Sequence, residues 1–172
     1  MGSSFTIKTE NLDILQKAMK RATASVLVGH RSGTIHKSLN PDRPGMDMAD
    51  LAKLNHFGGA GGSWIGSNSG TWTAVSSVRA RPYLTDGMRY NQQIIREGSS
   101  QFFKKAVQGL STRSELSTIG NQTVKAIRDM VHDGFYEGIA PNPPNVIEAK
   151  GSSVPLVDSG ALMSNLDYVV SK

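Results

Sequence analysis

Hydrophobic positions recur along the chain with two different periods, and these periods predict which segments are helical. Residues 11–22 have apolar side chains three to four positions apart, which indicates an amphipathic helix. The same spacing predicts one long helix over residues 85–108 and a second over residues 112–132. The apolar stripe of the second long helix consists of Leu116, Ile119, Thr123, Val124, Ile127, Met130 and Val131.

Polar residues at two helix starts predict N-terminal caps. Asp47 is the predicted N-cap of a helix over residues 47–57. Thr112 and Glu115 have the spacing of a capping box, in which the threonine caps the helix and the glutamate three residues later bonds back to it. The predicted apolar face of the helix after Asp47 holds Met48, Leu51, Leu54 and Phe57.

Short apolar runs rich in β-branched residues predict strands. Residues 24–30 indicate a buried strand that ends near Gly29, and residues 34–36 a very short strand. Residues 71–81 alternate like a strand and stop at Pro82. The tail predicts one or two helical turns followed by a strand at residues 166–172. We therefore expect an α+β fold, a small and largely antiparallel sheet packed against two long helices and an N-terminal helix.

Two segments have neither period. Residues 58–70 contain six glycines, so they bury too little apolar area to offset the entropy of ordering. We expect a flexible loop there, or a hairpin that pairs Trp64 and Ile65 with residues 71–75. Residues 138–158 are rich in proline and predict an extended segment. With these two features, residues 1–172 form one predicted domain.

Charge is unevenly distributed along the chain. The net charge of the 172 residues is +5. Residues 79–128 carry nine basic and three acidic side chains, whereas residues 129–172 carry two basic and six acidic ones. Such a division suits nucleic acid nearby, copies of the chain that pack front to back, or simply solvated helix faces. The absence of cysteine excludes disulfides, iron–sulfur clusters and thiolate zinc sites.

One tetrapeptide has the form of an aspartic protease active site: Asp158-Ser159-Gly160-Ala161. In a protease subunit most of the β-barrel follows this motif, but only 12 residues follow Gly160. We interpret it instead as a helix start, in which Asp158 or Ser159 accepts the N–H of Ala161 or Leu162. The four histidines lack the i, i+4 spacing of a metal site. We predict no catalytic set, metal or cofactor, and therefore no enzyme.

Four stretches of the chain, taken in order, are SVLVGH, MADLAKLNHFGG, VRARPYL and PPNVIEAKGSSVPLVDSGALMSNLDYVV. Together they resemble the tail-completion or neck proteins of tailed double-stranded DNA phages. These proteins are also described as head–tail joining, virion morphogenesis or minor tail proteins. The most specific part is Lys150-Gly151 together with the Pro-Leu-Val-Asp-Ser-Gly run at residues 155–160 and Leu162. Residues 80–84 match the arginine-proline turn of the family residue by residue. His56 departs from the family pattern, which has an acidic residue before the phenylalanine, and Asn165 stands where serine is usual.

The resemblance implies a structural protein of the virion, assembled in the cytoplasm of the bacterial host. Such proteins form a ring, commonly thought of as six copies, at the head–tail junction. They contact head connector or adaptor proteins and tail terminator or tail tube proteins. The ring surrounds the DNA channel and does not bind DNA sequence-specifically. The resemblance implies no membrane partner. It also implies no catalytic residues and no cofactor.

Several residues are the candidates for structural or interface roles. Arg81 and Pro82 form the predicted turn, and Asp158, Ser159 and Gly160 the predicted helix start. Trp64 and Trp72 are candidate anchors for a neighbouring protein. We expect acidic side chains to lie against basic ones of an adjacent copy, and the candidates are Asp129, Asp133, Glu137 and Glu148.

The alternative function is a nucleic-acid-binding module that uses the basic segment 79–128. Its phosphate ligands would be Arg79, Arg81, Arg89 and Arg96. Few aromatic residues lie among these arginines, so the sequence does not support base stacking.

Overall fold

Helices and short antiparallel strand pairs make up the structure, a computed structural model. It describes residues 9–21, 24–36, 45–66, 72–133, 141–157 and 159–171. The helices in these ranges are α1 (Thr9–Arg21), α2 (Met48–Phe57), α3 (Tyr83–Tyr90), α4 (Gln92–Val107), α5 (Arg113–His132), α6 (Pro144–Lys150) and α7 (Ala161–Asn165). The strands are β1 (Ser25–His30), β2 (Ile35–His36), β3 (Met46–Asp47), β4 (Gly59–Gly66), β5 (Trp72–Val78) and β6 (Leu166–Ser171).

The predicted α+β class is confirmed, but the strands do not form one sheet. Among the described residues they make three separate two-stranded ladders, β1–β6, β2–β3 and β4–β5, each antiparallel. The pairing of β1 with β6 joins a strand from the N-terminal part of the sequence to the last strand of the described chain. The predicted sheet is therefore a ribbon of two strands that needs a helix to cover it.

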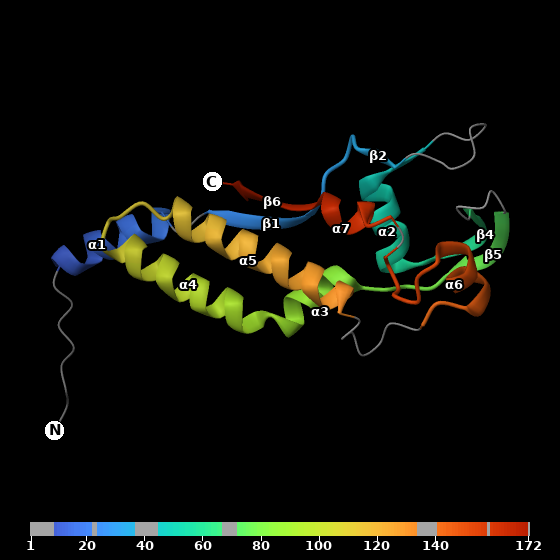
Figure 1. Ribbon diagram of the computed structural model, residues 1–172. Helices are drawn as coiled ribbons and strands as arrows, with labels where there is room; N and C mark the ends of the chain where they lie inside the picture. Colours follow the sequence, from blue (N-terminus) through green and yellow to red (C-terminus); the bar gives the residue numbers. More distant parts are fainter. Residues whose placement is uncertain are drawn as a thin grey trace, which may run out of the picture.

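Helix α5 lies at the centre of the arrangement. The β1–β6 ribbon runs along one side of α5, and α4 runs along the other (Figure 1). α1 packs against α4 at one end of the molecule, whereas α6 and the β4–β5 hairpin lie at the opposite end (Figure 1). α2 and α7 lie between the ribbon and the hairpin. The molecule is therefore elongated, and α1 and α6 are far apart.

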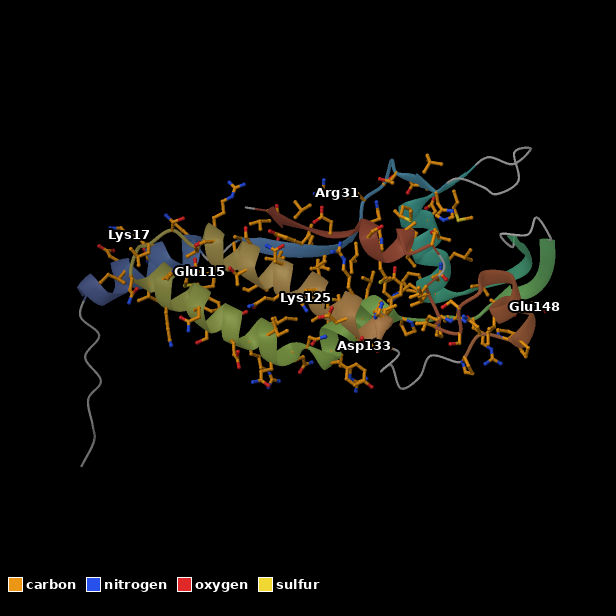
Figure 2. The ribbon with its side chains drawn as sticks, in the orientation of Figure 1. Lys17, Arg31, Glu115, Lys125, Asp133 and Glu148 are labelled. Carbon is orange, nitrogen blue, oxygen red and sulfur yellow. The ribbon has the colours of Figure 1, made fainter. Side chains whose placement is uncertain are left out.

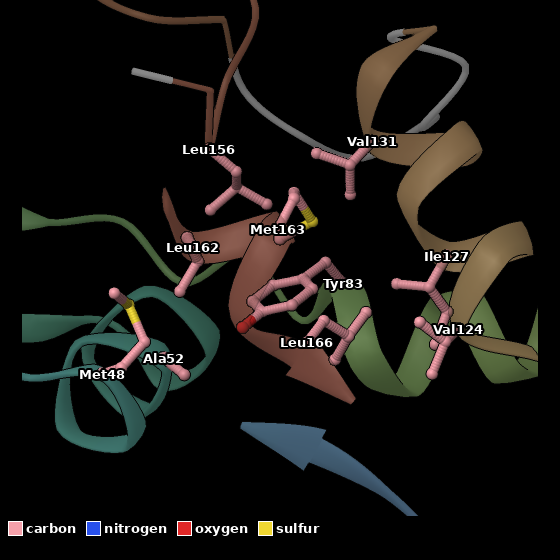
Figure 3. Packing of buried hydrophobic residues seen from close by; sticks show 10 residues of the cluster. All are labelled: Met48, Ala52, Tyr83, Val124, Ile127, Val131, Leu156, Leu162, Met163 and Leu166. Atoms are coloured by element: carbon pink, nitrogen blue, oxygen red, sulfur yellow. The ribbon is translucent and has the colours of Figure 1, made fainter. Parts of the chain in front are cut away.

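The main core lies where α2, α3, α5, α7 and β6 meet. Tyr83, Ile127 and Leu166 are its most completely buried side chains (Figure 3). The predicted stripe of α5 contributes to this core and to the contact with α4, and most of its members are buried as expected. The other members of the core cluster are Met48, Ala52, Val124, Val131, Leu156, Leu162 and Met163.

The prediction that residues 24–30 form a fully buried strand is wrong. β1 is half exposed, and Leu27 is 63% exposed on the side away from α5. Its partner Val169 on β6 is exposed as well. A ribbon covered by a helix on one face leaves alternate side chains in solvent, even where the sequence is apolar throughout.

The single long helix predicted over residues 85–108 is interrupted. α3 begins earlier, at Tyr83, and ends at Tyr90, and α4 starts only at Gln92. Between them, the Asn91 side chain donates a hydrogen bond to the Gly87 carbonyl at 2.8 Å. An asparagine side chain that bonds a carbonyl of the preceding turn competes with the backbone hydrogen bonds of the helix. The helix therefore breaks at Asn91, although the spacing of apolar residues continues through it.

α5 begins where predicted, but no capping box forms. The Thr112 side chain makes no cap hydrogen bond. Glu115 instead accepts hydrogen bonds from Lys105 on α4 and from the Ser114 hydroxyl. The charged partner on the neighbouring helix holds the carboxylate away from the Thr112 backbone, and it lowers the pKa of Glu115.

Two glycines let the neighbours of α5 approach closely. A Cβ on Gly98 of α4 would lie 2.3 Å from Ile119 Cγ1. A Cβ on Gly120 of α5 would lie 2.2 Å from Cδ2 of the Tyr168 ring on β6. Both faces of α5 are therefore packed at distances that only glycine permits.

The prediction of an extended segment over residues 138–158 is wrong in its middle. Residues 144–150 form α6, with Pro144 at the start, where proline has no N–H bond to lose. Gly151 ends the helix in the left-handed conformation, with φ at 70°. Residues 134–140 and Asp158 lie outside the described residues.

The glycine-rich stretch pairs as the hairpin alternative predicted. Trp64 is opposite Ala74, and Ile65 is opposite Thr73. The register shifts between Ala60 and Ser63, so the glycine-rich strand contains an irregularity. The ladder runs from Gly59 on β4 to Val78 on β5, and β4 lies near α6.

The two N-terminal helices agree with their predicted positions but not with every predicted apolar contact. Asp47 caps α2 and accepts the Ala49 N–H at 2.8 Å, as predicted. Phe57 is 75% exposed, so its assignment to the buried face is wrong. On α1, Ala18 is buried, but Met19 is 65% exposed. Both exposed residues lie at the margin of a stripe, where the spacing alone does not decide burial.

Among the helices in the described ranges, none has both the length and the apolarity that crossing a bilayer requires.

Candidate functional site

The arginine-proline turn connects the β4–β5 hairpin to α3. Pro82 occupies the N-cap position of α3. The Arg81 N–H donates to the Asn55 carbonyl at 2.8 Å, which fixes the turn against the end of α2. The Tyr83 N–H donates to the Arg81 carbonyl at 2.7 Å. Backbone hydrogen bonds on both sides of Pro82 therefore hold the turn, although the proline itself has no N–H to donate.

The Arg81 guanidinium binds another part of the chain. Its Nη2 donates to Asn142 Oδ1 at 3.0 Å, and Asn142 is only 4% exposed. The Asn142 amide in turn donates to the Val154 carbonyl at 3.3 Å. Burial lowers the pKa of Arg81, and the positive charge of Arg79 lowers it further. Through Asn142, Arg81 therefore connects the turn to Val154, in the segment between α6 and α7.

Tyr83 follows the turn and points into the core. Its ring is completely buried, and its hydroxyl forms a 2.7 Å hydrogen bond with His30 Nε2. The imidazole of His56 packs edge-on against the same ring, with the centroids 5.9 Å apart. Burial raises the pKa of Tyr83 well above its ordinary value, so the hydroxyl stays protonated.

The two histidines beside Tyr83 are held neutral. Burial lowers the pKa of His30, an effect that the Asn165 side chain partly offsets and the charge of Arg128 reinforces. Burial also lowers the pKa of His56, against the opposite effect of Asp86. His56 Nε2 forms a 3.1 Å hydrogen bond with Thr85 Oγ1. These polar groups join β1, α2 and α3 around the buried tyrosine.

The Pro-Leu-Val-Asp-Ser-Gly run reaches the same core from the C-terminal side. Leu156 and the α7 residues Leu162 and Met163 pack in one cluster with Tyr83 (Figure 3). The Ser159 hydroxyl accepts the Ala161 N–H at 3.4 Å, the bond expected of Asp158 or Ser159. The N-cap position itself, however, belongs to Gly160, which has a left-handed backbone.

Arg128 of α5 holds the end of α7. Its Nε donates to the Met163 carbonyl at 2.9 Å, and its Nη2 to the Ser164 and Leu166 carbonyls at 3.2 and 2.6 Å. These are carbonyls at the end of a short helix, which lack partners within that helix. A single guanidinium therefore ties α5 to the start of β6.

The structure thus brings Leu156 of the Pro-Leu-Val-Asp-Ser-Gly run into the core cluster of Tyr83, which belongs to the arginine-proline turn, and we call this the junction around Tyr83. Arg81 and Pro82 precede Tyr83 in the chain, and Ser159 and Gly160 precede α7, whose Leu162 and Met163 belong to the same cluster. Sequence analysis did not find three further residues of this junction, His30, Asn142 and Arg128. Nothing in the sequence marks Arg128, because its partners are backbone carbonyls 35 to 38 residues away.

The remaining candidates lie elsewhere. Trp64 and Trp72 are on β4 and β5, but their side chains lie outside the described part of the molecule, as does Glu137. Glu148 is on α6 and is exposed. Asp129 pairs with Lys125 one turn away on its own helix, and Asp133 lies 3.5 Å from His132. Asp129 and Asp133 therefore pair with residues close to them in sequence.

Gly160 offers a test of the helix start. Its φ is +77°, and a Cβ there would meet no atom within 4 Å. Gly160→Ala should therefore lower the free energy of unfolding by about 1–2 kcal/mol through backbone strain alone. Gly29→Ala is the matched control, because Gly29 has equally open space but no positive φ. Urea unfolding followed by circular dichroism measures both, and equal stability of the two variants would contradict the left-handed assignment.

The described residues contain no group of three or more histidine, aspartate or glutamate side chains placed to hold a metal ion. Comparisons of the chain with protein-family models, with curated proteins and with solved structures all gave no match, so the case for its function is made from its own residues.

Proposed function

We propose that the chain is a structural protein of the phage neck. In this proposal copies of it form a ring at the head–tail junction, which completes or joins the tail and surrounds the DNA channel. The observation that carries the proposal is the meeting of the arginine-proline turn and the Pro-Leu-Val-Asp-Ser-Gly run around Tyr83. Two of the stretches that resemble the neck family therefore contribute to one core, which supports a structural role.

The surface supports a protein that acts by association. Exposed large apolar side chains occur on α1, α4 and the β1–β6 ribbon, rather than as one or two isolated residues. Exposed apolar side chains on several elements favour contacts with other proteins. The proposed partners are further copies of the chain, head connector or adaptor proteins, and tail terminator or tail tube proteins.

The decisive experiment is genetic and structural. In a phage that encodes this chain, a nonsense mutation in its gene should yield DNA-filled heads and separate tails. Supplying the wild-type chain in trans should restore joined particles, and gold-labelled antibody should bind them at the neck. Joined, infectious particles that lack the chain would refute the proposed function.

The alternative is binding of nucleic acid through the basic segment 79–128. In its favour, Arg79, Arg89 and Arg96 are exposed. Arg81, the fourth candidate, is bonded to Asn142 and half buried, so one predicted phosphate ligand is already occupied. Direct contacts to phosphates would make the logarithm of the DNA affinity fall linearly with the logarithm of salt concentration, by about 0.9 per contact. A slope near three, lost in the Arg79, Arg89 and Arg96 alanine variants, would favour this alternative.

A further inference from the structure

His30 lies at the end of β1, where its imidazole meets the buried Tyr83 side chain. The Tyr83 hydroxyl is 2.7 Å from His30 Nε2, and Tyr83 has 0% exposure. Burial raises the pKa of Tyr83, so its hydroxyl is protonated and can donate to Nε2. In the neutral imidazole Nε2 then accepts, and the ring proton lies on Nδ1. A protonated imidazole could not accept this bond, because both of its nitrogens would be donors.

Two further polar side chains act on His30, one from α7 and one from α5. Burial is the main cause that lowers the pKa of His30, the Asn165 side chain opposes it, and the charge of Arg128 adds to it. His30 Nδ1 and Asn165 Oδ1 are buried, and among the described residues neither atom has a hydrogen-bond partner. The Arg128 guanidinium binds the carbonyls at the end of α7. A charge on His30 would therefore be buried near a second positive charge.

Acidic side chains on the surrounding elements are paired with other groups or act on another histidine. The ion pairs are Asp167 on β6 with Arg31, Asp50 on α2 with Lys53, and Asp129 on α5 with Lys125. Figure 2 shows Arg31 near the end of the ribbon and Lys125 on α5. Asp86 on α3 opposes the effect of burial on the pKa of His56, the second histidine against Tyr83. A negative charge thus compensates in part for burial at His56, whereas the charge that acts on His30 is the positive one of Arg128.

We propose that His30 is a pH-dependent switch that holds α7 and β6 in place when neutral and releases them in mild acid. Neutral His30 accepts the hydrogen bond of Tyr83 and leaves Arg128 bound to the three carbonyls at the end of α7. Protonation removes that acceptor and adds a positive charge near the guanidinium that joins α5 to the start of β6. This inference goes beyond the proposed function and does not depend on it.

Release in acid follows from where His30 binds the proton more tightly. Once α7 and β6 open, water surrounds His30 and its pKa returns to about 6.5. The closed form, in which the pKa of His30 is lowered, binds the proton less readily. The stabilisation of the closed form is therefore fully present well above about pH 6.5 and is lost as the pH falls below it. One such group changes the equilibrium constant of opening by up to about tenfold for each pH unit.

Hydrogen exchange read by mass spectrometry tests the switch on the purified chain between about pH 7.5 and 5.5, a range above the titration of ordinary carboxylates. After correction for the intrinsic pH dependence of exchange, the opening constant of residues 161–171 should rise at least about threefold from the higher pH to the lower. Residues 92–107 of α4 pack on α5 through Gly98 and Ile119, away from this switch, and should stay nearly unchanged.

Three variants assign the response to His30. His30→Gln keeps a side chain that can accept the Tyr83 hydroxyl but does not titrate, so the acid response of residues 161–171 should be lost. Asn165→Asp places a carboxylate where it can compensate the charged imidazole, and it should also remove the response. His56→Gln is the matched control, because it removes the other histidine against Tyr83 and should keep the response.

His30 is not a switch if residues 161–171 open equally at both pH values, or if every helix responds to acid to the same extent. The assignment also fails if His30→Gln retains the response, or if His56→Gln loses it. Should His30→Gln not fold, Asn165→Asp decides, and an acid response equal to that of the wild type would contradict the switch.

Discussion

Replacing Tyr83 with alanine is expected to lower the free energy of unfolding by about 3–5 kcal/mol, the range for truncating a buried aromatic residue. The Tyr83 ring has 0% exposure and lies among side chains from α2, α5 and α7. Its removal leaves a cavity and also leaves His30 Nε2 without the hydroxyl that it bonds at 2.7 Å. Urea titration followed by far-ultraviolet circular dichroism gives the change directly.

Two further variants separate the causes of this loss. Tyr83→Phe keeps the ring and removes only the hydroxyl, so it should cost about 1–3 kcal/mol for the unpaired histidine nitrogen. Phe57→Ala removes an aromatic residue that is 75% exposed and should cost about 1 kcal/mol or less. If Tyr83→Ala is no more destabilising than Phe57→Ala, Tyr83 is not at the centre of the core.

The second large effect is expected at Arg128. Arg128→Met keeps much of the aliphatic stem but removes the donors to the Met163, Ser164 and Leu166 carbonyls. Two of these bonds are partly buried, and each unpaired group costs about 1–3 kcal/mol, so the variant should be less stable by about 2–6 kcal/mol. Hydrogen exchange should accelerate first in α7 and β6, because the lost bonds hold these elements to α5.

Lys125→Met is the matched control for Arg128. It removes the same charge from the same helix, but Lys125 is exposed and its partner Asp129 is on the same helix. Its unfolding transition should stay nearly unchanged, as is usual for surface ion pairs. Equal loss in both variants would show that the charge of α5, rather than the carbonyl bonds, determines stability.

Helix positions were largely predictable because they depend on local spacing. The apolar stripe of α5 marks the face of the helix that is buried. Asp47 caps α2 by accepting a hydrogen bond from Ala49, two residues away. Local signals failed where a distant residue competes with them. Glu115 has the sequence of a capping box, but Lys105 on another helix takes its carboxylate.

The candidate site was predictable only in part. The arginine-proline turn and the helix start at Gly160 were recognisable as local features. Their union around Tyr83 was not, because Arg81 and Asn142 are 61 residues apart and His30 and Tyr83 are 53 apart. Hydrogen bonds of this kind depend on which distant segments pack together in the fold, and a short-range sequence pattern does not encode this packing.

The sequence by itself determined most of the helical segments, though not α6 or the break between α3 and α4, together with the α+β class and the division of charge between residues 79–128 and 129–172. Each follows from composition or from spacing within one segment. Only the tertiary structure decided that β1 pairs with β6 and that Arg81 is bonded to Asn142. The physical reason is that burial and proximity are properties of the packed chain, in which each residue's neighbours come from segments far apart in sequence.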